Sequence, residues 1–175
     1  MIQVKITKNM VIQAYKDAMS LGECKNSILR GQGNFTGFIG EEAVKSYLNI
    51  SQQRNNSYNY DITYHGISLD VKAKKTSVIP QMSYEASIAN FNTKQNCKYY
   101  VFTRVLWPQE MILPISVYIM GYFDKKDYMK KARFLKKGQV DGSNKFIVKA
   151  DCWNMFYSDL IEFDNFKEKY TPVLI

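Results

Sequence analysis

The chain has 175 residues, 46% of them hydrophobic, and we expect residues 1–175 to form one domain with its own core. No apolar run approaches the ~18 residues of a membrane helix, and the N-terminal MIQVKITKNM lacks the apolar core of a secretory signal. The three scattered cysteines are typical of a protein in a reducing compartment. We therefore expect a cytoplasmic protein without membrane association. The net charge of +8 is typical of a protein that binds a polyanion such as DNA, although a solvated basic surface would give the same balance.

Two helices are predicted in the first third of the chain. Residues 9–20 and 37–49 carry apolar side chains at helical spacing, and residues 22–34 are expected to form the loop between them. Glu41 falls at the edge of the second apolar stripe, from which it could reach a neighbouring sheet, whereas Glu42 points further into solvent. The favourable position of an acidic residue in the first helical turn is an alternative explanation of Glu41.

A β-hairpin is predicted over residues 58–75. Two alternating runs, YNYDITY and ISLDVKA, flank the dipeptide His-Gly at 65–66, and a glycine in a two-residue connection is typical of a tight hairpin turn. With that turn, Asp61 lies opposite Asp70. Side chains alternate between the two faces of a strand, so one face is apolar and the other is mostly polar. The polar face is expected to carry Asp61, Thr63, Ser68, Asp70, Lys72 and Lys74.

The pairing of Asp61 with Asp70 is physically unusual. Carboxylates that face each other on paired strands repel, unless a proton or a cation lies between them. Oxygen atoms are the ligands that Mg²⁺ prefers, and Lys72 projects from the same face, where its ammonium could orient a water or offset charge on a phosphate. The pattern therefore predicts a metal site for phosphodiester cleavage. A solvated sheet face with a cross-strand salt bridge is the alternative.

The rest of the chain is predicted to complete an α/β fold, with a mixed central β-sheet flanked by helices. Further strands are expected at residues 81–88, 98–106, 115–123 and 146–150. Further helices are expected at residues 124–136 and 152–163. The helix at 124–136 would present a basic face, for which a solvated charged face is the usual alternative. The hairpin strand ends in further lysines that could contact phosphates beside the cleavage position. The expected DNA-binding residues are Lys74, Lys75, Lys130, Arg133 and Lys137.

Asp61, an eight-residue gap and then Asp70-Val71-Lys72 resemble the core motif of the PD-(D/E)XK nuclease superfamily. The resemblance covers residues 35–75, including the helix with Glu41, and departs from the family pattern in having Tyr60 in place of Pro before Asp61. It implies a restriction-endonuclease-like core and the activity of a Mg²⁺-dependent DNA endonuclease, a metal-dependent hydrolase in which Mn²⁺ can substitute.

The resemblance also implies a role for each site residue. Asp61, Asp70 and the main-chain carbonyl of Val71 are the expected metal ligands. Glu41 would complete that site or bind a second ion, and Lys72 would position the attacking water. The residues leave two other classes open: a catalytically silent nuclease-like DNA-binding module or subunit of a larger nucleoprotein complex, and a binding protein without metal. No base-reading module is visible, which leaves a homodimer, a branched-DNA enzyme or a partner-dependent subunit.

Overall fold

A mixed five-stranded sheet, in the order β1-β6-β5-β3-β2, is the centre of the computed structural model, which describes residues 1–21, 34–51 and 58–172. Its strands are β1 Ile2–Lys5, β2 Ile62–Tyr64, β3 Ile67–Thr76, β5 Tyr99–Leu106 and β6 Ser116–Asp124. β3 and β5 are parallel, and the other neighbours are antiparallel. A second sheet, in the order β4-β8-β7, contains β4 Glu85–Ala89, β8 Cys152–Phe156 and β7 Arg133–Leu135. The predicted α/β class with a mixed central sheet is confirmed.

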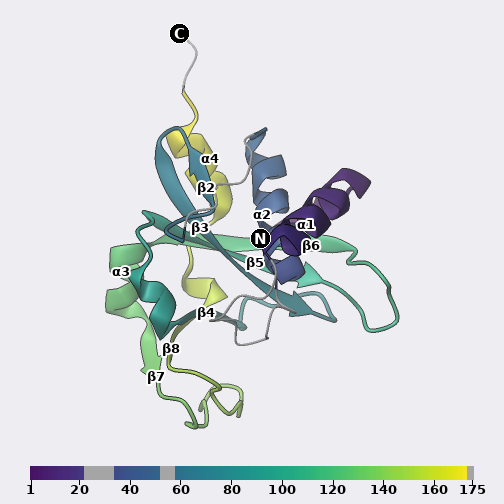
Figure 1. Cartoon of the computed structure of the whole chain (residues 1–175). Helices are drawn as coiled ribbons and strands as arrows, with labels where there is room; N and C mark the ends of the chain where they lie inside the picture. The colour runs from purple at the N-terminus through teal and green to yellow at the C-terminus, as the bar shows by residue number, and fades with distance from the viewer. Residues whose placement is uncertain (22–33, 52–57, 173–175) are drawn as a thin grey trace.

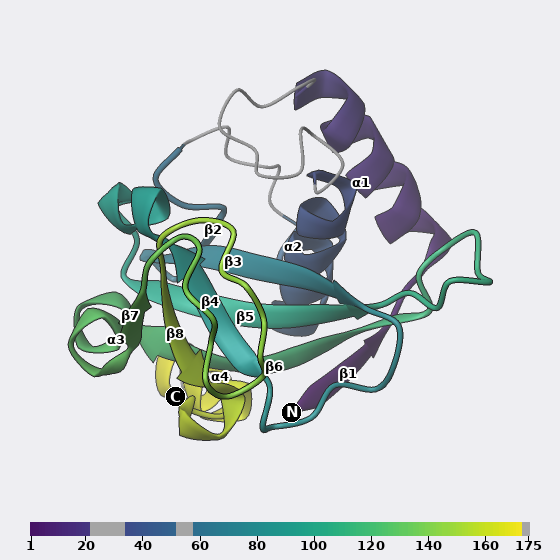
Figure 2. The same cartoon turned by 90° about the horizontal axis from the view of Figure 1, so that it is seen from below.

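Helices cover one face of the five-stranded sheet, and the second sheet covers the other (Figures 1 and 2). The helical side has α1 Lys8–Leu21, α2 Asn34–Leu48 and α4 Phe163–Tyr170. The other described helices are α3 Lys125–Lys131 and two short 3-10 helices, η1 Asn90–Lys94 and η2 Tyr157–Asp159. The helical core includes Val44, Val71 and Phe166. The core between the sheets includes Ile88, Phe102 and Met155. Both faces of the large sheet are therefore packed.

The predicted hairpin and its register are confirmed. Tyr64 pairs with Ile67, and the connecting residues His65 and Gly66 have φ of 46° and 80°, the two positive values that a type I′ turn requires. The main-chain N–H of Asp61 donates to the carbonyl of Leu69 at 2.9 Å, so the ladder continues to the residue before β2. Beyond that point the chain leaves β3. One edge of β3 therefore has no strand beside it from Asp70 onward in the described part of the chain.

Several predicted elements in the second half of the chain were wrong. The helix predicted at 124–136 ends at Lys131, because Ala132 adopts an extended backbone and the chain continues as β7. The helix predicted at 152–163 is instead β8 and η2, since Cys152–Phe156 pairs with both β4 and β7. Residues 146–150 contain only an isolated bridge between Val140 and Ile147. Local patterns favoured helices here, but pairing within the second sheet outweighs them.

The outcome for the remaining elements is mixed. The strand predicted at 81–88 begins only at Glu85 and belongs to the second sheet, while the sequence did not predict β1. The strands predicted at 98–106 and 115–123 and the helix at 9–20 are confirmed within two residues at each end. The loop predicted at 22–34 lies, up to residue 33, outside the described residues. No helix in the described ranges is long and apolar enough to span a membrane.

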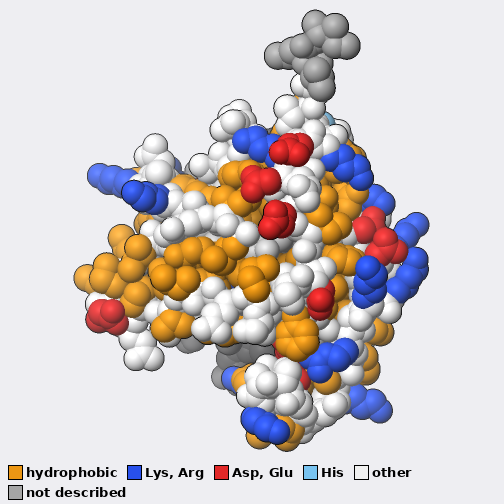
Figure 3. Space-filling model, turned by 180° about the vertical axis from the view of Figure 1, so that it is seen from behind, with side chains coloured by type: hydrophobic (Ala, Val, Ile, Leu, Met, Phe, Trp, Pro, Cys, Tyr) orange, Lys and Arg blue, Asp and Glu red, His pale blue; other side chains and the backbone are white. Residues whose placement is uncertain are grey.

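The loop between β5 and β6 carries the most exposed apolar side chain of the described residues. Ile112 is 91% exposed, and Met111 and Leu113 beside it are also exposed. The indole of Trp107 donates to the main-chain carbonyl of Met111 at 2.8 Å, and the N–H of Ile115 donates to the carbonyl of Leu106 at 2.8 Å, which joins the two ends of the loop. Figure 3 shows the resulting apolar projection at the left of the view. The loop follows the last residue of β5, so it lies at the end of the sheet away from Asp70, which pairs near the start of β5.

Candidate functional site

The open edge of β3 brings together two of the expected oxygen donors. Because β2 ends so early, the carboxylate of Asp61 takes the place of a strand and accepts from the main-chain N–H of Val71 at 2.7 Å. The N–H and C=O of one residue leave a strand on the same side. The carbonyl of Val71 therefore projects from the same edge, next to the Asp61 carboxylate, as expected for the candidate site.

Asp70 and Lys72 form a close pair on the side of β3 that faces the second sheet. Asp70 is 1% exposed, and its Oδ2 lies 2.5 Å from Nζ of Lys72. That oxygen accepts no well-directed hydrogen bond, so a buried carboxylate oxygen is held by an ionic contact alone. The alternative of a solvated sheet face is wrong. The salt bridge exists, but it joins neighbours on one strand and is nearly buried.

Glu41 approaches the same edge from the helical side. At Gly40, α2 lies directly on the sheet: an added Cβ would be 2.7 Å from Cβ of Ala73 and 2.8 Å from Oγ1 of Thr103. This close approach brings the next residue, Glu41, down beside β3, where it is 6% exposed. The helix begins at Asn34, so its first turn contains no acidic residue and the helix-dipole explanation of Glu41 is wrong.

The charges of the cluster act on Asp61 from both faces of the sheet. The surrounding protein desolvates this carboxyl, and the negative charges of Glu41 and then Asp70 add to that effect, so its pKa is raised well above its usual range. The Lys72 ammonium and the N–H of Val71 act in the opposite direction and are outweighed. Within the described part of the chain, the acids Glu41 and Asp70 thus act on Asp61 together, and the Lys72 ammonium opposes them only in part.

These residues fit a hard divalent cation. Two carboxylates and a main-chain carbonyl are a donor set that Mg²⁺ uses, with waters and substrate phosphates as its other ligands. A cation would also relieve the repulsion around Asp61 and could bind the Asp70 oxygen, which accepts no well-directed hydrogen bond. Among the described residues, no three His, Cys, Asp or Glu side chains lie close enough to cage an ion.

Gln95 belongs to the site and was not predicted. Its amide accepts from Nζ of Lys72 at 2.8 Å and donates to Oδ1 of Asp70 at 3.3 Å and to the carbonyl of Tyr58 at 3.0 Å. It therefore holds both members of the Asp70–Lys72 pair. Gln95 precedes β5, which returns parallel to β3, so the chain passes Asp70 again at this point. The parallel pairing of two predicted strands was the signal that could have identified it.

The predicted DNA-binding residues do not form one surface. Lys130 pairs with Asp127 at 3.0 Å. Arg133 lies in β7 and not on a helix, and its guanidinium contacts the buried carboxylates of Glu85 and Asp141. Lys137 is exposed in the loop after β7, so the continuous basic helical face predicted for residues 124–136 was wrong. Lys74 and Lys75 are both exposed on β3. Of these two, Lys74 projects from the face of Asp70 and Lys72, while Nζ of Lys75 lies 4.2 Å from the ring centre of Trp107.

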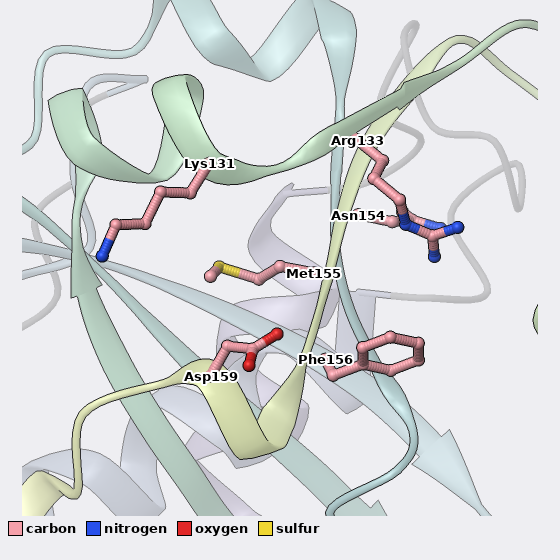
Figure 4. Close-up of a pocket in the computed structure, with 6 residues that line it drawn as sticks. All are labelled: Lys131, Arg133, Asn154, Met155, Phe156 and Asp159. Carbon is pink, nitrogen blue, oxygen red and sulfur yellow. The ribbon is translucent and has the colours of Figure 1, made fainter.

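A cavity of about 390 Å³ opens elsewhere, between α3, β7, β8 and η2. Its lining residues are Lys131, Arg133, Asn154, Met155, Phe156 and Asp159 (Figure 4). In Figure 4, Met155 points between Lys131 and Asp159, whereas Asn154 and Phe156 project from the other side of β8, and Arg133 reaches that side from β7. The polar groups do not converge on one point, so the acidic edge of β3 remains the better candidate site.

Comparison of the chain with protein-family models, with curated proteins and with solved structures found no match. The chemistry of the site therefore has to be inferred from its own residues.

Replacing Asp61 by Asn is expected to stabilise the fold at neutral pH, by on the order of 1 kcal/mol. A carboxyl whose pKa is raised by folding binds its proton more tightly in the folded state than in the unfolded state. The parent therefore loses stability as the pH rises from the pKa of Asp61 in the unfolded chain toward its raised pKa in the folded protein. Asn carries no charge and its oxygen can still accept from Val71. Urea unfolding between about pH 4 and 8 should show a flatter profile for the variant.

Asp124→Asn is the matched control, with the opposite sign. Burial works against ionisation of Asp124, but the Lys98 ammonium and the N–H groups at the start of α3 lower its pKa. Its negative charge therefore stabilises the fold at pH values above the pKa of Asp124 in the unfolded chain. Asn can still cap α3 but loses the pair with Lys98, which should cost about 0.5 kcal/mol at pH 7. Equal destabilisation by both substitutions would contradict the electrostatic description of Asp61.

Proposed function

We propose that this protein is a Mg²⁺-dependent DNA endonuclease of the PD-(D/E)XK type, with a restriction-endonuclease-like core. The observation that carries the proposal is the meeting, at the open edge of β3, of the Asp61 carboxylate, the main chain of Val71 and the buried Asp70–Lys72 pair. The buried Glu41 of α2 supports it, because its negative charge acts on Asp61 and would be offset by a bound cation. The net charge of +8 supports a nucleic acid as the substrate.

Asp61, Asp70 and the carbonyl of Val71 would hold Mg²⁺ or Mn²⁺, which would polarise the scissile phosphate and lower the pKa of a water molecule. Gln95 and Asp70 hold the Lys72 ammonium at the edge of this donor set, so that its positive charge offsets the charge that develops on the phosphate. Glu41 either completes the donor set or holds a second ion. The packing of Gly40 against the sheet keeps this acid in place.

A catalytically silent nuclease-like DNA-binding module, or a subunit of a larger nucleoprotein complex, is the second candidate. The observation that favours it is the engagement of Lys72, which contacts Asp70 at 2.5 Å and donates to Gln95 at 2.8 Å. In a silent module these contacts would be purely structural. In an enzyme the ammonium must exchange part of them for the substrate phosphate.

Cleavage of supercoiled plasmid in Mg²⁺, Mn²⁺ or EDTA distinguishes the candidates, with parent protein and Lys72→Ala side by side. We expect metal-dependent cutting by the parent, a loss of at least about a hundredfold in Lys72→Ala, and a higher melting temperature of the parent in Mg²⁺ through binding linkage. Lys16→Ala, which removes a charge from the exposed side of α1, is the control and should cut normally. Failure to cut plasmid, single-stranded or branched DNA, with no shift in melting temperature, would overturn the nuclease proposal.

A further inference from the structure

We infer that Lys74 and Arg104 form a phosphate subsite for the nucleic-acid strand, one step along β3 from the Asp70–Lys72 pair. This inference rests on the proposed action on nucleic acid, but it concerns binding and does not depend on cleavage.

The two side chains are neighbours on one face of the sheet. Lys74 and Arg104 are register partners on the parallel strands β3 and β5. Side chains alternate along a strand, so both leave the face that also carries Asp70 and Lys72. Two residues of a strand span about 6.6 Å. The pair therefore lies one such step from Lys72, on the side away from Asp70.

Arg104 is held rigidly by neutral partners. Its Nε donates to the hydroxyl of Tyr157 at 2.7 Å, and Nη2 donates to the main-chain carbonyl of Glu85 at 3.3 Å. Its guanidinium carbon lies 5.6 Å and 5.3 Å from the ring centres of Tyr84 and Tyr157. A guanidinium has five N–H donors, and these hydrogen bonds use two of them. The Arg104 guanidinium would therefore lose little conformational entropy when it binds an anion, and its other N–H groups remain as donors.

Neither cation is neutralised within the described part of the chain, where no salt bridge involves Lys74 or Arg104. Lys74 is exposed, yet protein atoms crowd its ammonium closely enough to desolvate it. This desolvation and the charge of Arg104 lower its pKa to about 8, and the Cys152 thiol and the Glu85 carboxyl counter them only in part. Two adjacent like charges that form no salt bridge with the described residues are costly, and an anion placed between them would relieve both.

The position identifies the anion as a backbone phosphate of nucleic acid. A ligand that reaches both Lys72 and this pair must carry negative charges spaced along an extended chain, which successive phosphates of one strand supply. A phosphodiester also accepts several N–H donors at once, in the geometry that Arg and Lys provide. The subsite would hold the strand beside the candidate cleavage position and set its direction along β3.

Binding of a fluorescently labelled duplex, followed by anisotropy in EDTA between about 50 and 200 mM salt, tests the subsite without cleavage. Lys74→Ala should weaken binding about fivefold or more and reduce the slope of log affinity against log salt by about one. Lys16→Ala removes the same charge from α1, on the opposite face of the sheet, and should change neither. From pH 7 to 9 the affinity of the parent should fall more steeply than that of Lys74→Ala, because only the parent loses the Lys74 charge.

Arg104→Gln is the second variant, and its melting temperature shows whether it folds; if it does not, Lys74→Ala decides alone. Lys74→Ala with parental affinity and salt slope would overturn the subsite, while the nuclease proposal would still stand or fall by the plasmid assay. A parent that does not bind DNA in EDTA or in Ca²⁺ would overturn the subsite whatever the plasmid assay shows.

Discussion

Asp70→Asn is expected to lower plasmid cleavage by about a thousandfold or more, while DNA affinity in EDTA stays within about twofold of the parent. Asn has nearly the shape of Asp and can keep its place between Lys72 and Gln95, so the fold should persist. The substitution removes the charge of a buried carboxylate that the proposed metal ion would need as a ligand. Affinity should change little because it depends mainly on phosphate contacts by basic residues.

Initial rates of plasmid relaxation in Mg²⁺, paired with anisotropy on the same preparations, measure the two effects separately. Asp127→Asn is the matched control: Asp127 is exposed, pairs with Lys130 on α3 and should be replaceable without loss of cutting. An Asp70→Asn protein that cuts as fast as the parent would remove Asp70 from the mechanism. An order in which nicked circles precede linear product would indicate that the two strands are cut in separate events.

Two glycines of α2 are expected to respond to alanine with opposite signs. Gly40→Ala should lower the free energy of unfolding by about 1–3 kcal/mol, because its Cβ would overlap Ala73 and Thr103 and push the helix off the sheet. Gly37→Ala meets nothing within 4 Å and should raise the free energy of unfolding by up to about 1 kcal/mol through helix propensity. Urea unfolding of the two variants at pH 7 measures both effects.

The same pair of variants tests the placement of Glu41. Displacement of the helix at Gly40 should move Glu41 away from Asp61, so Gly40→Ala should also lose most of its cleavage at temperatures where it is still folded. Gly37→Ala should cut like the parent. If Gly40→Ala is folded and cuts normally, Glu41 does not need its observed position, and the candidate site reduces to Asp61, Asp70 and Lys72.

The sequence predicted the hairpin and its acids because the information there is local. The turn at 65–66 requires two positive φ values, which the His-Gly pair supplies, and the turn then determines which residues lie opposite each other. From that register the meeting of Asp61 with Asp70 follows by counting. Burial of Asp70 did not follow, since Gln95, which contacts its carboxylate, comes from the segment just before β5.

The second sheet could not be predicted from local patterns. The segments of β7 and β8 contain apolar residues at spacings that a helix also satisfies, and their strand state comes from pairing with β4 and with each other. A polar network also stabilises the second sheet: Arg133 contacts Glu85 and Asp141, and Asn154 donates to Glu85 at 2.8 Å. These partners come from four separate segments of the chain. Gln95 was missed for the same reason, because only the parallel return of β5 brings it to Asp70.

The shortness of β2 also matters for how copies of this protein behave toward one another. An unpaired strand edge is a template on which a second chain can add, the first step of aggregation. Beyond Leu69, β3 has such an edge as far as the described residues extend, and the acids Glu41, Asp61 and Asp70 gather where it begins. A strand that docked there would have to bury these charges beside its own backbone. We therefore expect the residues that we assign to metal binding also to disfavour the addition of a strand at this edge.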